Sequence, residues 1–145
     1  MDKLTKKERS ANMSKSRSKN TKPELFVRKY IFAQGVRYRC NVLDLPGKPD
    51  IANKRCRLAL DVHGCFWHGH KNCKRFRFPK TNQQFWKQKI SKNIIRDEAT
   101  RNALLELGFN YTVIWECEVK SGALSKLDTF ISVYHDKKQG MDEGR

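Results

Sequence analysis

Hydrophobic and polar positions along the first third of the chain predict a helix followed by an extended segment. Thr21 and Glu24 have the spacing of a helix capping box, which places a helix from about 22 to 34. Gly35 follows, and glycine commonly ends helices. From 36 to 42 large apolar side chains alternate with polar ones, the period of two that is typical of a strand.

Two further extended segments flank a polar turn at 53–55. The first covers 49–52, and in the second, from 58 to 62, apolar and other side chains again alternate. The segment 63–78 is crowded with histidine, cysteine and aromatic residues and predicts an irregular loop. Together these patterns predict a hairpin whose second strand leads into a loop rich in candidate ligands.

Helical spacing resumes from about 82 to 107, and Gly108 provides its stop. Residues 111–115 form a short β-branched run that is typical of a buried strand. Beyond Val133 the chain becomes polar, so we expect a fraying tail. The resulting order, α-β-β-β-α-β, predicts an α/β fold with a mixed central sheet.

The 145 residues are enough for one domain with a core of its own. We expect a basic arm at 1–20, a folded domain at 21–133 and a polar tail at 134–145. No apolar run approaches the ~20 residues that span a bilayer, and no export signal is evident at the N-terminus. The five cysteines are therefore expected to be thiols or metal ligands rather than disulfide partners.

The charge balance of the chain predicts that it binds a polyanion. Lys and Arg total 31 against 15 Asp and Glu, a formal net charge of +16. Such an excess favours nucleic acid as the partner. The arm contributes Lys15, Arg17 and Lys19 among others, and the plainer alternative is that it is a solvated tail with no specific role.

A pair of carboxylates is predicted at one end of the sheet. Asp50 opens one strand of the hairpin and Asp61 lies near the end of the next, so pairing about the turn brings them together. His63 lies two residues after Asp61 and shares its face of the strand. Carboxylate oxygens are the ligands that Mg²⁺ prefers, and such an ion assists phosphodiester hydrolysis. The alternative is that both are ordinary polar residues at strand ends, with Glu24 only a capping residue.

A second group of residues has the chemistry of a zinc site. Thiolate and imidazole are the donors that Zn²⁺ selects, and three cysteines with one histidine complete a tetrahedral shell. The candidates are Cys65, His70, Cys73 and Cys117. A buried Cys117 could instead be a small apolar residue, and His68 is an alternative ligand.

Several motifs give these residues a family resemblance. Asp50 with Asp61-Val62-His63 looks like the nuclease pattern Pro-Asp…Asp/Glu-x-Lys, with His in place of Lys. Over roughly residues 8 to 120 the chain resembles the very-short-patch repair mismatch endonucleases. The motifs that carry this resemblance are Leu45-Pro-Gly-Lys-Pro-Asp50, His63-Gly-Cys-Phe-Trp-His68, Phe85-Trp86, Lys92-Asn93 and Trp115-Glu-Cys117.

The resemblance implies a restriction-endonuclease-like core that nicks one DNA strand beside a T·G mismatch, of the kind left when 5-methylcytosine deaminates. It implies roles for five side chains: Asp50 as the Mg²⁺ ligand, His63 and His68 as active-site histidines, and Glu24 and Asp97 as supporting acids. Some members have non-acidic residues where this chain has Asp61 and Val62. Asp61 restores the acidic position of the wider nuclease pattern and is a candidate ligand, and the backbone carbonyl of Val62 can serve where its side chain cannot.

We expect His68 to deprotonate the attacking water and His63 to stabilise charge at the phosphate in place of Lys. On the apolar stripe of the second predicted helix, Asp97 needs a partner. Arg101 is the structural candidate for that partner, and His68 is the functional one.

DNA contacts are expected from aromatic residues beside the basic surface. Phe66, Trp67 and Trp86 are candidates to wedge between bases at a step that the mismatch has loosened, the alternative being core packing. Met13 resembles the apolar residue with which the family enters the opposite groove. The arm would clamp phosphates through its basic side chains.

The predicted function is Mg²⁺-dependent nicking of mismatched double-stranded DNA by a monomer with a structural zinc. The resemblance also implies a bacterial cytoplasmic, nucleoid-associated setting and a functional link to a DNA cytosine methyltransferase and a repair polymerase. One alternative is a related nuclease with a broader or different mismatch preference. Another is a zinc-containing DNA-binding module without catalysis, which would have no use for the two carboxylates.

Overall fold

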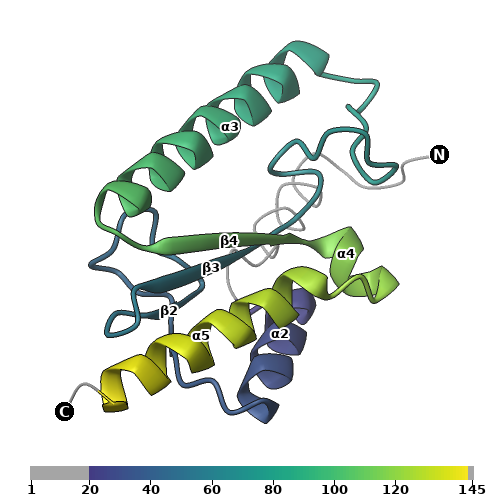
Figure 1. Ribbon diagram of the computed structural model, residues 1–145. Coiled ribbons are helices and arrows are strands. Elements are labelled where there is room, and N and C mark those ends of the chain that lie inside the picture. Colours follow the sequence, from purple (N-terminus) through teal and green to yellow (C-terminus); the bar gives the residue numbers. More distant parts are fainter. Residues whose placement is uncertain (1–19, 144–145) are drawn as a thin grey trace.

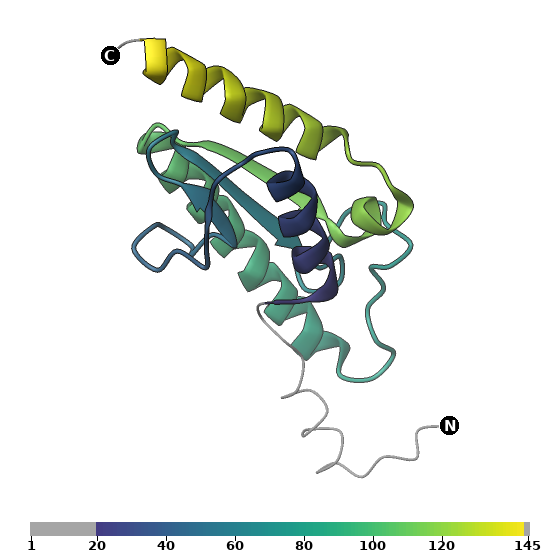
Figure 2. The ribbon, with the colours of Figure 1, turned by 90° about the horizontal axis from the view of Figure 1, so that it is seen from below.

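The central sheet lies between one long helix and a pair of helices on the opposite face (Figures 1 and 2). The computed structural model describes residues 20–143. The strands lie side by side in sequence order: β1 (Arg39–Cys40), β2 (Ile51–Asn53), β3 (Leu58–His63) and β4 (Asn110–Trp115). The first three are antiparallel and β4 runs parallel to β3, so the mixed sheet and the predicted α-β-β-β-α-β order are confirmed.

Helix α3 (Gln83–Glu106) covers one face of the sheet, and α2 (Lys22–Ala33) and α5 (Ser125–Glu143) cover the other (Figure 1). The short helix α4 (Glu116–Ser121) directly follows β4. The side chain of Thr21 accepts a hydrogen bond from the Glu24 N–H at 3.4 Å, as the capping pattern predicts. None of the helices within residues 20–143 combines the length and the apolar character needed to cross a bilayer.

Strand β3 is buried on both faces, and this burial decides where its polar residues point. Leu58 and Leu60 pack into the core beneath α2 and α5, while Ala59 joins the smaller core that includes Leu104 of α3. Because side chains alternate along a strand, Asp61 and His63 share the face of Ala59. Each is at most 8% exposed. The sheet therefore carries two ionisable groups in its interior, on the α3 side.

The strand predicted for 36–42 is regular only at Arg39–Cys40. Backbone bonds continue past it, from the Asn41 N–H to the Asp50 carbonyl and from the Val42 N–H to the Pro49 carbonyl. Asn41 has a positive φ of 50°, in the left-handed region that strands avoid. The ladder therefore continues beside Asp50 while the regular strand ends.

The expectation of a fraying polar tail after Val133 is wrong. Helix α5 continues to Glu143 and buries Leu127, Phe130 and Tyr134, which recur at helical spacing on one face. The Nζ of Lys137 donates a hydrogen bond to the Cys56 carbonyl at 2.9 Å, which attaches this helix to the turn before β3. Neither α4 nor α5 was predicted from the sequence.

Candidate active site

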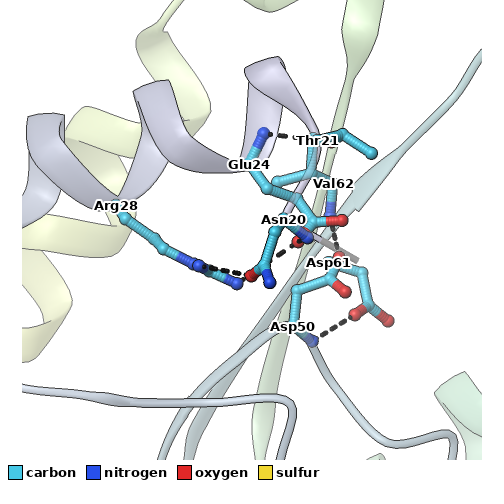
Figure 3. A network of polar contacts seen from close by, with 7 residues as sticks. All are labelled: Asn20, Thr21, Glu24, Arg28, Asp50, Asp61 and Val62. Carbon is cyan, nitrogen blue, oxygen red and sulfur yellow. Dashed lines mark hydrogen bonds and ion pairs between the residues drawn. The ribbon is translucent and has the colours of Figure 1, made fainter. Parts of the chain in front are cut away.

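Two carboxylates meet where β2 begins and β3 ends (Figure 3). The backbone N–H of Asp50 donates a hydrogen bond to Asp61 Oδ1 at 2.8 Å. Asp50 Oδ2 accepts a hydrogen bond from the Val62 N–H, also at 2.8 Å. These two bonds fix Asp50 by its backbone and by its side chain, so the carboxylate is held before any ligand arrives.

A third acid, Glu24 of α2, joins this pair from the opposite side (Figure 3). Its Oε2 accepts hydrogen bonds from the Asn20 N–H at 2.9 Å and from Arg28 Nη2 at 3.3 Å. Glu24 is only 3% exposed. With Asp50, Asp61 and both histidines it lines a cavity of about 380 Å³, so its position goes beyond that of a capping residue.

Burial makes this acid cluster electrostatically unfavourable in the absence of a cation. It raises the pKa of Asp50 to about 8, and the neighbouring charge of Asp61 adds to the rise. Burial also raises the pKa values of Asp61 and Glu24. An oxygen-seeking divalent cation would relieve the repulsion and the desolvation together. The donor set therefore fits such an ion.

The two active-site histidines are stacked face to face beside the acids. The ring centroids of His63 and His68 lie 3.8 Å apart, and the rings are within 4° of parallel. His68 Nδ1 lies 2.7 Å from Asp97 Oδ2, so the partner of Asp97 is His68 rather than Arg101. An ionised carboxylate only accepts hydrogen bonds, so Nδ1 is the nitrogen that donates to Asp97, and Nε2 is the nitrogen that this bond leaves available.

His63 differs from the lysine that it replaces in the nuclease pattern. Burial lowers the pKa of His63 to about 3. The ring also meets the edge of Trp115 at a centroid distance of 5.2 Å. His63 is thus neutral near pH 7 and offers a hydrogen bond to a phosphate, but no positive charge.

The predicted zinc ligands are brought together by a loop and a helix. One donor atom from each of Cys65, His70, Cys73 and Cys117 lies within 4.8 Å of the others. A tetrahedral zinc with sulfur at ~2.3 Å needs edges of about 3.8 Å, so the group can close on the ion by a small contraction. His68 belongs to the other cluster, with His63 and Asp97.

The protonation of the cysteine group is uneven. Burial raises the pKa of Cys65 to about 12, whereas a hydrogen bond from the Arg75 N–H lowers the pKa of Cys73. The imidazole of His70 stacks on Trp115 at 4.0 Å. Trp115 therefore touches His63 of the acid site and His70 of the cysteine group, and it connects the two clusters.

The sequences of known proteins place this chain in a family. The sequence model described as DNA mismatch endonuclease Vsr matches residues 1–75. The DNA mismatch endonuclease Vsr of Escherichia coli K12 is 37% identical over 112 residues, covering 77% of this chain and 71% of the relative. This chain belongs to the Vsr family of DNA mismatch endonucleases.

Other relatives of this chain are called nicking enzymes. Type II nicking enzyme V.NmeAIP of Neisseria meningitidis serogroup A is 45% identical over 125 residues, or 86% of this chain and 89% of the relative. Type II nicking enzyme V.XorIIP of Xanthomonas oryzae is 44% identical over 124 residues, which cover 85% of this chain and 90% of the relative. The family resemblance seen in the sequence motifs is confirmed, and with it an endonuclease that acts on DNA.

The predicted wedge residues of this Vsr-family chain pack on one another. Phe66, Trp67 and Trp86 make edge contacts with centroids 5.2 to 5.8 Å apart, and each is half-buried. They form a cluster of their own, outside both hydrophobic cores. Four predicted DNA contacts lie outside the described residues: Met13, Lys15, Arg17 and Lys19.

Two polar residues of the Vsr-family site escaped the sequence analysis as functional candidates. The Tyr111 hydroxyl donates to Asp61 Oδ2 at 2.5 Å. Asn93, 7% exposed, donates from Nδ2 to the Trp67 carbonyl at 2.8 Å. Asn93 lies in a motif that carries the resemblance, which is a usable signal. Tyr111 lies in an apolar strand, where nothing in the pattern distinguishes it from a core residue.

The loop that carries His68 and His70 is packed tightly on α3 at the intervening glycine. Gly69 has a φ of +60°, and a Cβ there would lie 2.8 Å from Ile94 Cδ1 and 2.9 Å from Ile90 Cγ2. Only glycine meets both conditions without strain. This contact holds the backbone between the two histidines close to α3.

Proposed function

We propose that this Vsr-family endonuclease nicks one strand of duplex DNA beside a T·G mismatch, of the kind left by deamination of 5-methylcytosine, by Mg²⁺-dependent hydrolysis. The observation that carries the proposal is the convergence of three acids, two of them buried, and a His68–Asp97 pair on one cavity. Acids that repel one another and a histidine held by a carboxylate are the parts that metal-assisted phosphodiester hydrolysis requires.

Asp50, the Val62 carbonyl and, on the opposite side, Glu24 are the groups that would hold Mg²⁺. When bound, the ion supplies positive charge to the phosphate and the leaving oxygen. Asp50 is suited to this role because hydrogen bonds at its N–H and at Oδ2 fix its orientation. Arg28 binds the far oxygen of Glu24, which keeps that side chain turned toward the cavity.

His68 is the proposed general base. Asp97 holds its Nδ1–H, so Nε2 can take a proton from water as the water oxygen attacks phosphorus and one P–O ester bond breaks. The carboxylate of Asp97 then stabilises the imidazolium that forms, as in other His–Asp pairs. Neutral His63, stacked on His68, would donate a hydrogen bond to a phosphate oxygen.

A structural Zn²⁺ held by Cys65, His70, Cys73 and Cys117 completes the proposal. Three of these ligands come from the segment between β3 and α3, which contains no regular helix or strand. Closing four ligands on one ion would fix this segment and therefore His68 within it.

We propose that recognition uses intercalation of Phe66, Trp67 and Trp86, supported by Met13 from the opposite groove. A T·G wobble pair stacks less well than a matched pair, so opening the adjacent step costs less there. Phosphate contacts from Lys15, Arg17 and Lys19 would add affinity without sequence preference.

The proposed cellular setting follows from the same family relationship. The sheet would be the core of a restriction-endonuclease-like fold acting as a monomer at the bacterial nucleoid. A DNA cytosine methyltransferase would generate the base whose deamination creates the substrate. A repair polymerase would then extend from the nick.

The proposal is tested by incubating full-length, zinc-loaded protein with a panel of duplexes that each contain one mismatch. We expect a Mg²⁺-dependent nick in one strand of the T·G duplex, at least about tenfold faster than on any other duplex. Similar rates on several mismatches would favour the nuclease of broader preference. Binding without cleavage of any duplex in Mg²⁺ would favour the non-catalytic module.

A further inference from the structure

Asp61 differs from the other two acids in how its oxygens are used. Its Oδ1 accepts a hydrogen bond from the Asp50 N–H at 2.8 Å, and its Oδ2 accepts one from the Tyr111 hydroxyl at 2.5 Å. Asp61 is 8% exposed, so water contributes little to its solvation. Both carboxylate oxygens are therefore engaged by donors of the protein itself.

Asp50 and Glu24 each keep one oxygen free of such bonds. Within residues 20–143, hydrogen bonds reach Asp50 only at Oδ2 and Glu24 only at Oε2. Asp50 Oδ1 and Glu24 Oε1 are thus the carboxylate oxygens left for a cation in the cavity that these residues line.

The donor to Asp61 is placed by the parallel pairing of β3 with β4. Asp61 is paired with Val113, and Tyr111 lies two residues earlier on the same face of the sheet. Arg101 of α3 lies over the Tyr111 ring, with its Cζ 5.3 Å from the ring centroid. The phenol is held by α3 on one side and by the strand on the other, so its hydroxyl is a fixed donor.

We propose that Asp61, oriented by Tyr111, is a positioning residue that aligns Asp50 and is not itself a ligand of Mg²⁺. This inference rests on the proposed Mg²⁺-dependent function. It assigns to Asp61 a role different from the one that the nuclease pattern Pro-Asp…Asp/Glu-x-Lys suggests. Asp61 and Tyr111 form one unit, which links β4 through β3 to the start of β2.

The test compares kcat at saturating Mg²⁺ with the half-saturating Mg²⁺ concentration. Asparagine at 61 keeps an oxygen for the Asp50 N–H but is a poor cation ligand, so Asp61→Asn should retain kcat within about threefold. Asp61→Ala removes the acceptor and should lower kcat by about 30-fold or more. Tyr111→Phe should lower kcat about fivefold while the half-saturating Mg²⁺ concentration stays within about twofold.

A matched control is available on the opposite face of the sheet. The Tyr30 hydroxyl donates to Asp128 Oδ1 at 2.6 Å, so Tyr30→Phe removes the same kind of bond away from the cavity. This variant should keep the wild-type kcat. Thermal melting of all variants distinguishes misfolding from misplacement of Asp50.

Two outcomes would overturn the inference. One is a kcat for Asp61→Asn as low as that of Asp50→Asn, because Asp61 would then act as a ligand. The other is a Tyr111→Phe variant that is indistinguishable from Tyr30→Phe. Bound Mn²⁺ counted by electron paramagnetic resonance separates this inference from the proposed function. If wild-type protein shows no Mg²⁺-dependent nicking, the proposed function fails, while the positioning role still predicts that Asp61→Asn binds Mn²⁺ and Asp50→Asn does not.

Discussion

The acid cluster and the cysteine–histidine cluster lie on either side of Trp115, yet they are built in opposite ways. Asp50 and Asp61 come from paired strands, and their carboxylates are anchored by backbone N–H groups and a tyrosine. Three of the four cysteine–histidine ligands come from a segment without helix or strand. Regular strands thus position the first cluster, whereas an irregular segment supplies most of the second.

This difference teaches how the two ions would contribute to the molecule. Removing the cation from the acid cluster leaves an intact scaffold, in which burial and mutual repulsion raise the pKa values of Asp50 and Asp61. Removing Zn²⁺ from the cysteine cluster leaves a loop without helix or strand that is held by its side-chain contacts with α3 and Trp115. Each change below acts directly on one of the two clusters.

The largest effect is expected for Asp50→Asn. The amide cannot supply the negative charge that a divalent cation requires, so nicking should fall by at least about 1000-fold. Binding of T·G duplex should survive, because it does not depend on this carboxylate. Rates on a T·G substrate and a gel-shift titration measure the two properties. A near wild-type rate would show that the acid site has been misassigned.

A smaller effect on rate but a larger effect on stability is expected for Cys73→Ser. Losing one ligand should release Zn²⁺ and lower the free energy of unfolding by about 3 kcal/mol. Elemental analysis and thermal melting are the measurements. Cys40→Ser, at an exposed thiol outside the cluster, is the matched control and should change neither. Wild-type protein purified without chelators that contains no zinc would contradict the prediction.

Within the acid site, the two stacked histidines should contribute unequally to kcat. His68→Ala removes the proposed base and should lower kcat about 100-fold, more than His63→Ala, which removes only a neutral donor. The kcat of Asp97→Asn should lie between those of the wild type and His68→Ala, because the carboxylate that fixes the tautomer of His68 is lost. Single-turnover rates on T·G duplex give the order. A larger loss for His63→Ala would reverse the assignment.

The smallest effect concerns stability and pH in protein free of divalent cations. Because the folded-state pKa of Asp50 is about 8, against 3.8 for an ordinary aspartate, the folded protein holds a proton that the unfolded chain releases. The free energy of unfolding should therefore fall as pH rises from about 4 to about 8. The Asp50→Asn variant does not lose stability in this way. Its free energy of unfolding at pH 8 should therefore be about 1–3 kcal/mol higher than that of the wild type.

The titration of His63 does not affect the comparison of wild type with Asp50→Asn. Its lowered pKa gives stability that rises with pH between about 3 and 6.5, and this contribution is present in both proteins. Urea titrations at pH 5 and pH 8 measure the difference between wild type and Asp50→Asn. Equal stabilities at pH 8 would mean that Asp50 is not buried beside a like charge.

Much of the acid site could be predicted from the sequence because its parts are local. Asp50 and Asp61 are joined by a short hairpin, whose turn and alternation set the register. The His68–Asp97 contact was one of two predicted alternatives, since helical geometry places Asp97 on the packed face of α3. Tyr111 could not be found, because its contact depends on a parallel pairing that no local pattern reveals.

Sequence patterns served less well at the end of the chain. Helix α5 is mostly polar, and the composition after Val133 suggested a tail. Its apolar residues nevertheless recur at helical spacing, and Tyr134 is 2% exposed. The composition of a segment counts all faces of a helix together, whereas only the residues on one face need to be apolar for the helix to pack on the core. The irregular segment 63–78 was predicted as a loop, and the packing of its aromatic residues on one another depends on contacts that the sequence does not encode locally.

Both clusters are closed by residues from the last third of the chain, and this has a consequence for synthesis. Tyr111 meets Asp61 across 50 residues, and Cys117 meets His70 across 47. Contacts of such separation form only after the intervening chain has been made and α3 has folded back on the sheet. A growing polypeptide on the ribosome therefore carries the hairpin acids early but acquires a complete nuclease centre late.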